Sequence, residues 1–337
     1  MIPGLPLTAL APMQRITDLP FMRVIAEYGP PDYFFTEYFR IHPAWNLEKS
    51  ILQSITENRT GRPVFAQIMG EDVSLMRRAV AELGKYPIAG VDLNMGCPVP
   101  AIYKRNVGGG LLRDPEKVDE VLGALRAATR GLFTVKMRVG FESPAHFDRI
   151  LALINQHSVD LLSLHGRTVM ERYNGDVHYD LIAHAVRVVK CPVLANGNIT
   201  SAEKAARVLA ETGAAGVMLG RHAIRNPFIF RQCRERFQGL PLTPVSLLDI
   251  RGYVEKLYRA MYIDGMSVNA QVNATKRFLN FVGTSVDPRG MFIHDMRRAN
   301  TDRELFAVCD QYLTQQGAEP FELEPFSGVL ARPNCES

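Results

Sequence analysis

The first two-thirds of the chain repeats one pattern, in which a short apolar run is followed by a longer stretch with helical periodicity. Short apolar runs between turn-forming residues are typical of strands that are buried on both faces. We identify eight such runs, at residues 7–11, 33–36, 64–68, 91–94, 134–137, 161–165, 193–196 and 216–219. The apolar spacing between them predicts helices near residues 18–27, 72–84, 115–128, 145–156, 179–188, 202–211 and 227–237.

Several of these helices have recognisable start signals. Asp114 precedes a proline, which fits an N-cap followed by proline at the first helical position. Thr200 and Glu203 have the spacing of a capping box. Asp18 and Ser201 are further candidate caps. These signals support the helix positions that the apolar pattern predicts.

Strands that alternate with helices predict a parallel sheet with helices outside it. Eight strand–helix units over about 235 residues have the length of a closed (β/α)8 barrel, also called a TIM barrel. A doubly wound open sheet is the alternative, but no Gly-x-Gly-x-x-Gly motif follows the first strand. We therefore expect an α/β protein built on a TIM barrel.

The pattern changes at a segment rich in proline and glycine, residues 239–244, which reads as a linker. After it only helical periodicity is present, at residues 245–263, 267–282, 288–297 and 301–315. We therefore expect four parts: a barrel at 1–238, the linker at 239–244, a small helical domain at 245–316 and an irregular tail at 317–337.

Composition and charge narrow the class of protein. Hydrophobic residues make up 47% of the 337-residue chain, yet no apolar run is long enough to cross a membrane, and the start does not read as a signal peptide. Five scattered cysteines without a Cys-x-x-Cys pair argue against disulfides and zinc and favour the cytoplasm. The net charge of +4 permits a polyanionic partner without requiring one.

Candidate chemistry appears where the strands end. In a barrel the carboxyl ends of all strands meet at one rim, which is where catalytic groups lie. Each residue there has an ordinary explanation, such as a core histidine or a simple turn, but together they form a polar set at one end. The set is Ala11, Pro12, Met13, Gln67, Asn94, Cys97, Lys136, Arg138, His165, Gly166, Arg167, Asn196, Gly197, Asn198, Gly220 and Arg221.

This set suggests a flavin mononucleotide (FMN) site, with a sugar phosphate as the alternative ligand. Loops after strands seven and eight form the usual phosphate site of such barrels. A lysine would stabilise negative charge on a reduced flavin, and a glutamine can both donate and accept at the edge of the ring. The candidate cofactor residues are Ala11, Pro12, Met13, Gln67, Lys136, His165, Asn196, Gly197, Asn198, Gly220 and Arg221; no metal site is expected.

Cys97 stands out within the set because it sits on a tight turn directly after a predicted buried strand. Gly96 offers unusual backbone freedom and Pro98 donates no amide hydrogen, so the turn is well defined. A cysteine packed as a small hydrophobic residue is the ordinary explanation. The neighbouring Asn94 and the glycines at 108–110 favour a functional thiol instead.

Seven motifs together resemble the tRNA-dihydrouridine synthases. They are Leu-Ala-Pro-Met at 10–13, Gln-Ile-Met-Gly at 67–70, Asp-Leu-Asn-Met-Gly-Cys-Pro at 92–98, Val-Lys-Met-Arg at 135–138, Leu-His-Gly-Arg-Thr at 164–168, Ala-Asn-Gly-Asn-Ile at 195–199 and Met-Leu-Gly-Arg at 218–221. The likeness runs from residue 7 to about 238 and continues weakly at 274–279. Met69 departs from many relatives, and the chain beyond about 317 has no counterpart.

The resemblance implies reduction of the C5–C6 double bond of particular tRNA uridines, with FMN and with NADPH or NADH as the electron donor. Cys97 would give a proton to C5 after hydride reaches C6, and a thiol with a reference pKa near 8.5 stays mostly protonated at neutral pH. Asn94, Lys136 and Arg138 match positions that approach the uracil. The target base, expected in the D-loop, must leave its stack to reach the flavin.

Basic residues around the rim and on the helical domain are expected to bind the tRNA backbone. The protein is expected to be a monomer. The candidates are Lys104, Arg105, Arg172, Lys276, Arg277, Arg297 and Arg298, each of which could equally be a solvated charge. The segment at 103–112 follows Cys97 and is expected to cover the reacting base.

Two other functions fit parts of this pattern. An FMN barrel acting on a small molecule, as dihydroorotate dehydrogenases do, would leave the helical domain unexplained; activity on free uracil or orotate would favour it. A non-catalytic tRNA-binding module would leave Cys97 and the flavin set unexplained; a colourless protein that binds tRNA would favour it.

Overall fold

The protein is described here from a computed structural model that covers residues 4–314 and 319–331. Its sheet is the (β/α)8 barrel that the strand–helix alternation predicts, and all eight predicted strands are present. The two-residue β3, which no apolar run announces, is additional. The strands are β1 (Leu7–Leu10), β2 (Phe34–Phe35), β3 (Phe39–Arg40), β4 (Val64–Met69), β5 (Gly90–Met95), β6 (Leu132–Arg138), β7 (Leu161–His165), β8 (Val193–Asn196) and β9 (Gly216–Leu219).

Every strand pairing in the barrel is parallel. The order is β1-β9-β8-β7-β6-β5-β4-β2, with β3 paired to the end of β4. A parallel bridge between Ala9 and Tyr33 joins β1 to β2 and closes the ring. Since all strands run in one direction, their carboxyl ends meet at one rim.

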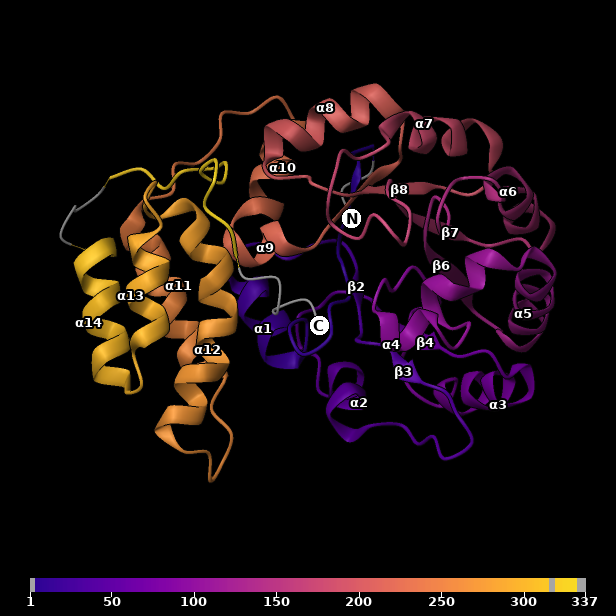
Figure 1. Ribbon diagram of the computed structural model, residues 1–337, viewed down its shortest axis with the longest axis horizontal. Coiled ribbons are helices and arrows are strands. Elements are labelled where there is room, and N and C mark those ends of the chain that lie inside the picture. The colour runs from indigo at the N-terminus through magenta and orange to yellow at the C-terminus, as the bar shows by residue number, and fades with distance from the viewer. Residues whose placement is uncertain (1–3, 315–318, 332–337) are drawn as a thin grey trace.

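Helices surround the barrel in the predicted order (Figure 1). Outside the ring lie α1 (Leu19–Glu27), α2 (Lys49–Thr56), α3 (Val73–Leu83), α4 (Pro100–Tyr103), α5 (Pro115–Ala128), α6 (Phe147–Gln156), α7 (Tyr179–Val188), α8 (Ala202–Thr212), α9 (Arg221–Arg225) and α10 (Ile229–Phe237). The helices α2, α4 and α9 and the 3-10 turn η1 (Gly108–Arg113) were not expected from the pattern, since they are short and have no side-chain cap.

Three of the predicted caps are confirmed. The side chains of Asp18, Asp114 and Ser201 accept hydrogen bonds from the first turns of α1, α5 and α8. The capping box of Thr200 and Glu203 is wrong, because Ser201 is the N-cap of α8 and accepts from the Lys204 amide at 3.1 Å. The helix therefore starts one residue later than that box requires.

The barrel is filled rather than open through its centre. Its interior is packed by apolar side chains from several strands, namely Ala9, Ala11, Phe35, Phe65, Leu161, Leu194 and Met218. A larger apolar core lies between the strands and the surrounding helices. Ligand access is therefore limited to the rim. No helix in the described ranges is long and apolar enough to span a membrane.

Four helices follow the barrel and pack beside it as a bundle (Figure 1). They are α11 (Leu247–Ala260), α12 (Val268–Val282), α13 (Met291–Arg298) and α14 (Asp302–Leu313), with a 3-10 turn η2 (Gly283–Ser285) after α12. Phe21 of α1 stacks on Phe278 of α12 at 5.3 Å, and the Tyr253 hydroxyl donates to the Ile224 carbonyl at 3.0 Å. The bundle thus rests on α1 and α9, at the side of the rim.

The segment 319–331 returns from the bundle toward the barrel without forming a helix. Arg225 of α9 anchors it: Nη2 donates to the Leu323 carbonyl at 2.7 Å and Nη1 to the Ser285 hydroxyl at 2.5 Å. One buried guanidinium therefore joins the barrel, the bundle and this segment. The remainder of the predicted tail, including Cys335, lies outside the described residues.

Candidate active site

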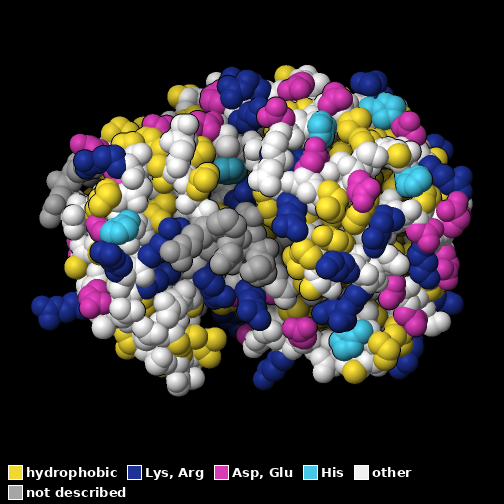
Figure 2. Space-filling view, viewed as in Figure 1, with side chains coloured by type: hydrophobic (Ala, Val, Ile, Leu, Met, Phe, Trp, Pro, Cys, Tyr) yellow, Lys and Arg dark blue, Asp and Glu magenta, His cyan; other side chains and the backbone are white. Residues whose placement is uncertain are grey.

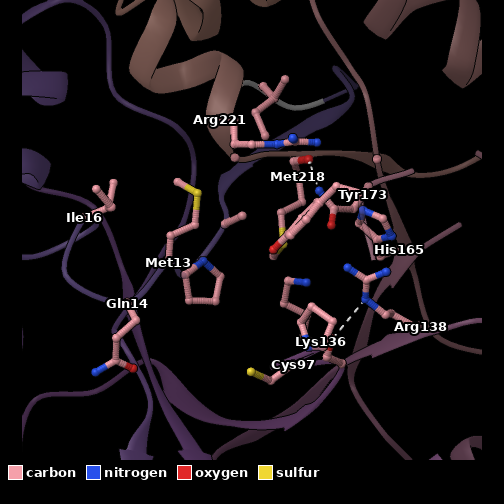
Figure 3. A pocket seen from close by; sticks show the side chains of 18 of the residues that line it. Met13, Gln14, Ile16, Cys97, Lys136, Arg138, His165, Tyr173, Met218 and Arg221 are labelled. Atoms are coloured by element: carbon pink, nitrogen blue, oxygen red, sulfur yellow. Dashed lines mark hydrogen bonds between the residues drawn. The ribbon is translucent and has the colours of Figure 1, made fainter. Parts of the chain in front are cut away.

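A cavity of about 250 Å³ lies at the rim where the strands end (Figure 3). It collects nearly all the predicted strand-end residues, although they are up to 210 positions apart in the chain. Ala11, Pro12, Met13, Asn94, Cys97, Lys136, Arg138, His165, Asn196, Gly197, Asn198, Gly220 and Arg221 line it. Gly166, Arg167 and Gln67 do not line it; the Gln67 side chain is fully buried one layer below, against Asn94.

The Cys97 turn is shaped by Asn94, the last polar residue of β5. The Asn94 Oδ1 accepts hydrogen bonds from the Gly96 amide at 3.1 Å and the Cys97 amide at 3.0 Å. Gly96 does not adopt a positive φ, so the expectation of unusual backbone freedom there is wrong. Space does not require glycine there either, since a Cβ would lie at ordinary contact distance, 3.4 Å, from the Met137 carbonyl carbon of β6.

The Cys97 thiol is a protonated acid at neutral pH. Burial raises its pKa, and the positive charges of Arg138 and Lys136 only partly offset that rise. In Figure 3 the thiol points into the cavity from the end opposite Arg221 and Tyr173. The side chain can therefore give a proton to a group held inside the cavity.

Lys136 projects from β6 into the same space (Figure 3). Removal from water and the nearby Arg138 together lower its pKa to about 8, against the opposing effects of Asp92 and Cys97. The amine is thus charged at neutral pH but close to its titration point. It can stabilise negative charge that develops on a bound ring.

Arg138 ties the Cys97 turn to the loop that follows β7. Its Nε donates to the Gly96 carbonyl at 3.0 Å, and its Nη1 donates to the carbonyls of Thr168 at 2.8 Å and Arg172 at 2.7 Å. Burial lowers its pKa to about 10, so it stays charged at neutral pH. Within the described chain no hydrogen bond uses its Nη2, which leaves that end of the guanidinium for a ligand.

The ends of β7, β8 and β9 form a cationic corner. Gly197 and Asn198 both have positive φ, 124° and 43°, so the chain turns sharply after β8. Arg221 Nη2 donates to the Asn198 Oδ1 at 3.3 Å, and Arg167 lies near Arg221. A sharp turn beside the Arg221 guanidinium is suited to an anion such as a phosphate.

His165 lies between that corner and Lys136. Burial and the charges of Arg138 and Lys136 hold its pKa well below the usual range, so the imidazole is neutral. Its buried Nδ1 has no partner among the described residues. A buried polar atom without a partner is costly, so this atom fits a ligand that has a polar edge.

Several lining residues were not predicted from the sequence. Tyr173 lies against Arg221, with its ring 4.5 Å from the guanidinium carbon, and Phe281 comes from α12 of the bundle. Tyr38 and His222 also line the cavity. Loop geometry and helix docking bring these side chains in, and neither leaves a periodic signal in the sequence. Tyr173 alone had a clue, its place soon after the motif at 164–168.

The predicted basic residues fall into two groups. Lys104, Arg105, Arg172 and Arg298 are exposed. Lys276 is buried, with its Nζ donating to the Arg297 carbonyl at 3.1 Å, and Arg297 donates to Asn280 at 2.8 Å. Arg277 is half-buried, and its Nε donates to the Ala274 carbonyl at 3.3 Å. Figure 2 shows dark blue Lys and Arg side chains near the middle of this face, between bundle and barrel.

The segment at 103–112 is less open than expected from the sequence. Only residues 104–106 are exposed, and the three glycines at 108–110 are buried against the Cys97 turn. A Cβ on Gly109 would lie 2.8 Å from the Cys97 carbonyl oxygen. Most of this segment therefore supports the turn from behind. Among described residues no group of His, Cys, Asp and Glu is arranged to hold a metal ion.

Comparison with known proteins gives one family. The family model described as dihydrouridine synthase (Dus) matches residues 9–261. A probable tRNA-dihydrouridine synthase of Helicobacter pylori is 35% identical over 235 residues, which are 69% of this chain and 71% of the relative. The tRNA-dihydrouridine synthases B of Pseudomonas putida (34% over 241 residues; 71% and 71%) and Vibrio cholerae (35% over 258 residues; 74% and 79%) are similar.

Solved structures share the barrel at low identity. An old yellow enzyme homologue from Zymomonas mobilis has a TM-score of 0.51 at 14% identity, covering 70% of this chain and 89% of its own. A histamine dehydrogenase from Rhizobium sp. 4-9 has a TM-score of 0.51 at 14% identity, covering 74% and 48%. At this identity the likeness establishes the fold alone.

Proposed function

The chain belongs to the dihydrouridine synthase family, and from this premise we propose that it reduces uridine in tRNA to 5,6-dihydrouridine with FMN bound at the barrel rim. The electron donor would be NADPH or NADH. The observation that carries the proposal is the single cavity that holds a protonated Cys97 thiol, the Lys136 amine and a cationic corner.

The residues of the cavity fit FMN. The turn at Gly197 and Asn198, with Gly220 and Arg221 opposite, would hold the phosphate, and the unpartnered His165 Nδ1 would meet the polar edge of the ring. Lys136 would lie beside the ring and stabilise its negative charge. Bound in this way, the flavin would supply the hydride that goes to C6 of the uracil.

Cys97 would complete the reduction by giving its proton to C5. The raised pKa keeps the proton on sulfur until a more basic carbon is presented, which is the property required of a general acid. This role differs from that of a nucleophilic cysteine, whose pKa is lowered.

Asn94, Lys136 and Arg138 would hold the uracil. Asn94 has one amide hydrogen left after its bond to Gln67, and Arg138 has its Nη2. Donors aimed at the uracil oxygens stabilise the charge that develops as hydride arrives. Both residues also shape the Cys97 turn, so the groups that bind the base and the group that protonates it are built as one unit.

The bundle of α11 to α14, which follows the linker at 239–244, would bind the tRNA backbone beside the rim. The target base must leave its stack to enter a cavity of this depth, which requires grip on the flanking backbone. Exposed Lys104, Arg105, Arg172 and Arg298 are suited to that grip, whereas the buried Lys276 is not.

The test is incubation of the purified FMN-loaded protein with NADPH and an unmodified tRNA transcript, followed by mass-spectrometric mapping. Dihydrouridine at defined positions is expected, with none formed from free uridine. Reduction of free orotate or uracil without tRNA would contradict the proposal and favour an enzyme of small molecules. A colourless protein that binds tRNA would favour a non-catalytic module.

A further inference from the structure

A chain of hydrogen bonds runs below the cavity from a buried carboxylate to the catalytic turn. Asp92 Oδ2 accepts from Gln67 Nε2 at 2.7 Å, and Gln67 Oε1 accepts from Asn94 Nδ2 at 2.9 Å. Asn94 Oδ1 then accepts from the Gly96 and Cys97 amides. The other carboxylate oxygen of Asp92 accepts from a threonine hydroxyl at 2.6 Å.

Strand register brings these side chains together. Gln67 of β4 pairs with Asp92 of β5, and Asn94 follows two residues later on the same inward face. Gln67 and Asp92 are fully buried, so water cannot substitute for a lost partner. Each group in the chain therefore depends on its neighbour for its hydrogen bonds.

The carboxylate of Asp92 sets the donor-to-acceptor direction of these hydrogen bonds. An amide can present either its oxygen or its NH2 group, but an ionised carboxylate only accepts. Asp92 therefore orients the NH2 group of Gln67 toward itself, and the Gln67 oxygen then faces Asn94. Asn94 donates to that oxygen, so its own oxygen faces the Cys97 turn. Without an acceptor at position 92, Gln67 could reverse and turn its NH2 group toward the NH2 group of Asn94, which would repel it. A reversed Asn94 would in turn present its NH2 group to the backbone amides of the Cys97 turn.

We propose that Asp92 is a positioning residue for the reaction: through Gln67 and Asn94 it fixes the turn that aims the Cys97 thiol. This inference rests on the proposed function, in which Cys97 donates the proton. The negative charge of Asp92 also favours the charged form of Lys136.

The decisive experiment separates the two half-reactions of the FMN-loaded enzyme by stopped flow. Asp92→Leu keeps the branched shape of the side chain, at a larger volume, and removes the acceptor. We expect the tRNA-dependent oxidation of reduced enzyme to slow by about 100-fold, the usual cost of a small misplacement of a reacting group. Reduction of the flavin by NADPH, which does not use Cys97, should stay within about threefold of wild type.

The conservative variant distinguishes positioning from simple loss of packing. Asp92→Asn can still present an oxygen to Gln67, since the Thr134 hydroxyl can accept from its NH2 group. We expect the rate to recover to within about tenfold of wild type. The rate of Asp92→Asn should fall at a lower pH than the rate of wild type as the pH is raised. Lys136 loses the stabilising charge of Asp92, while Arg138, His165 and Cys97 stay around it.

Gln67→Met serves as a second variant if Asp92→Leu does not retain FMN, and the same selective loss is expected. Ser163→Ala is the matched control, because this buried hydroxyl lies beside Lys136 in the sheet register and has no partner among described residues. The inference would be overturned if tRNA oxidised the reduced Asp92→Leu or Gln67→Met enzyme at the wild-type rate. Equal losses of this rate in Asp92→Asn and Asp92→Leu would overturn it as well. A wild-type enzyme that tRNA does not oxidise would instead refute the proposed function.

Discussion

The titration of Lys136 gives a pH dependence that can be worked out from the structure. Its pKa is lowered to about 8 by burial, whereas a solvated lysine titrates near 10.5. The charged form exists below the pKa, so catalytic support from the amine is full at pH 7 and lost as pH rises through about 8. At pH 9 only about a tenth of the amines would be charged, which predicts a roughly tenfold lower kcat/KM for tRNA.

Two comparisons assign this alkaline decline to Lys136. The pKa of Cys97 is raised, so the thiol keeps its proton through the same range and cannot cause the fall. Lys136→Arg carries a guanidinium, which titrates well above a lysine amine, so its profile should be flat between pH 7 and 9 at a lower absolute rate. The assay is dihydrouridine formation at limiting tRNA in buffers of constant ionic strength. A wild-type profile that is flat to pH 10, or an unchanged decline in Lys136→Arg, would show that the reasoning is wrong.

Three further predictions test other parts of the account. Arg221→Ala should weaken FMN retention by about tenfold or more through loss of a charge-assisted phosphate contact, measured by flavin fluorescence during dialysis; full retention would argue against the cationic corner as the phosphate site. The double variant Lys104→Gln, Arg105→Gln should lower tRNA affinity in filter binding, and the slope of log affinity against log salt concentration should fall by about two. Lys276→Gln should change neither quantity. The reverse ranking of the two variants would show that the tRNA binds elsewhere. Arg225→Met should lower the free energy of unfolding in urea by about 3 kcal/mol, because the part-buried carbonyls of Glu322 and Leu323 lose their donor. An unchanged midpoint would contradict this role.

The barrel could be predicted from the sequence because strands buried on both faces leave continuous apolar runs. The runs at 91–94 and 134–137 became β5 and β6, with the polar residues at their ends where the fold requires them. The two-residue β3 and the 3-10 turn at 108–113 escaped detection, since neither is long enough to develop a period.

Most residues that line the cavity could be predicted from the sequence, but the contacts that each side chain makes could not. Cys97 and Lys136 line the cavity as the strand ends imply. Gln67 accepts from Asn94 and does not line the cavity, because register places it one layer lower; its contact with a flavin stays a prediction. Arg138 makes three hydrogen bonds to backbone carbonyls. Phe281, which lines the cavity, belongs to α12 of the bundle. Rotamers and helix docking decide these roles, and both depend on tertiary contacts.

The role of Cys97 is tested most directly by one measurement, the oxidation of NADPH-reduced Cys97→Ala enzyme by tRNA, with dihydrouridine counted by mass spectrometry. The variant should stay yellow and accept electrons from NADPH at the wild-type rate. Its tRNA-dependent oxidation should fall by at least about 100-fold, the contribution expected of a general acid. Dihydrouridine formed at the wild-type rate would contradict the assignment of Cys97 as the proton donor.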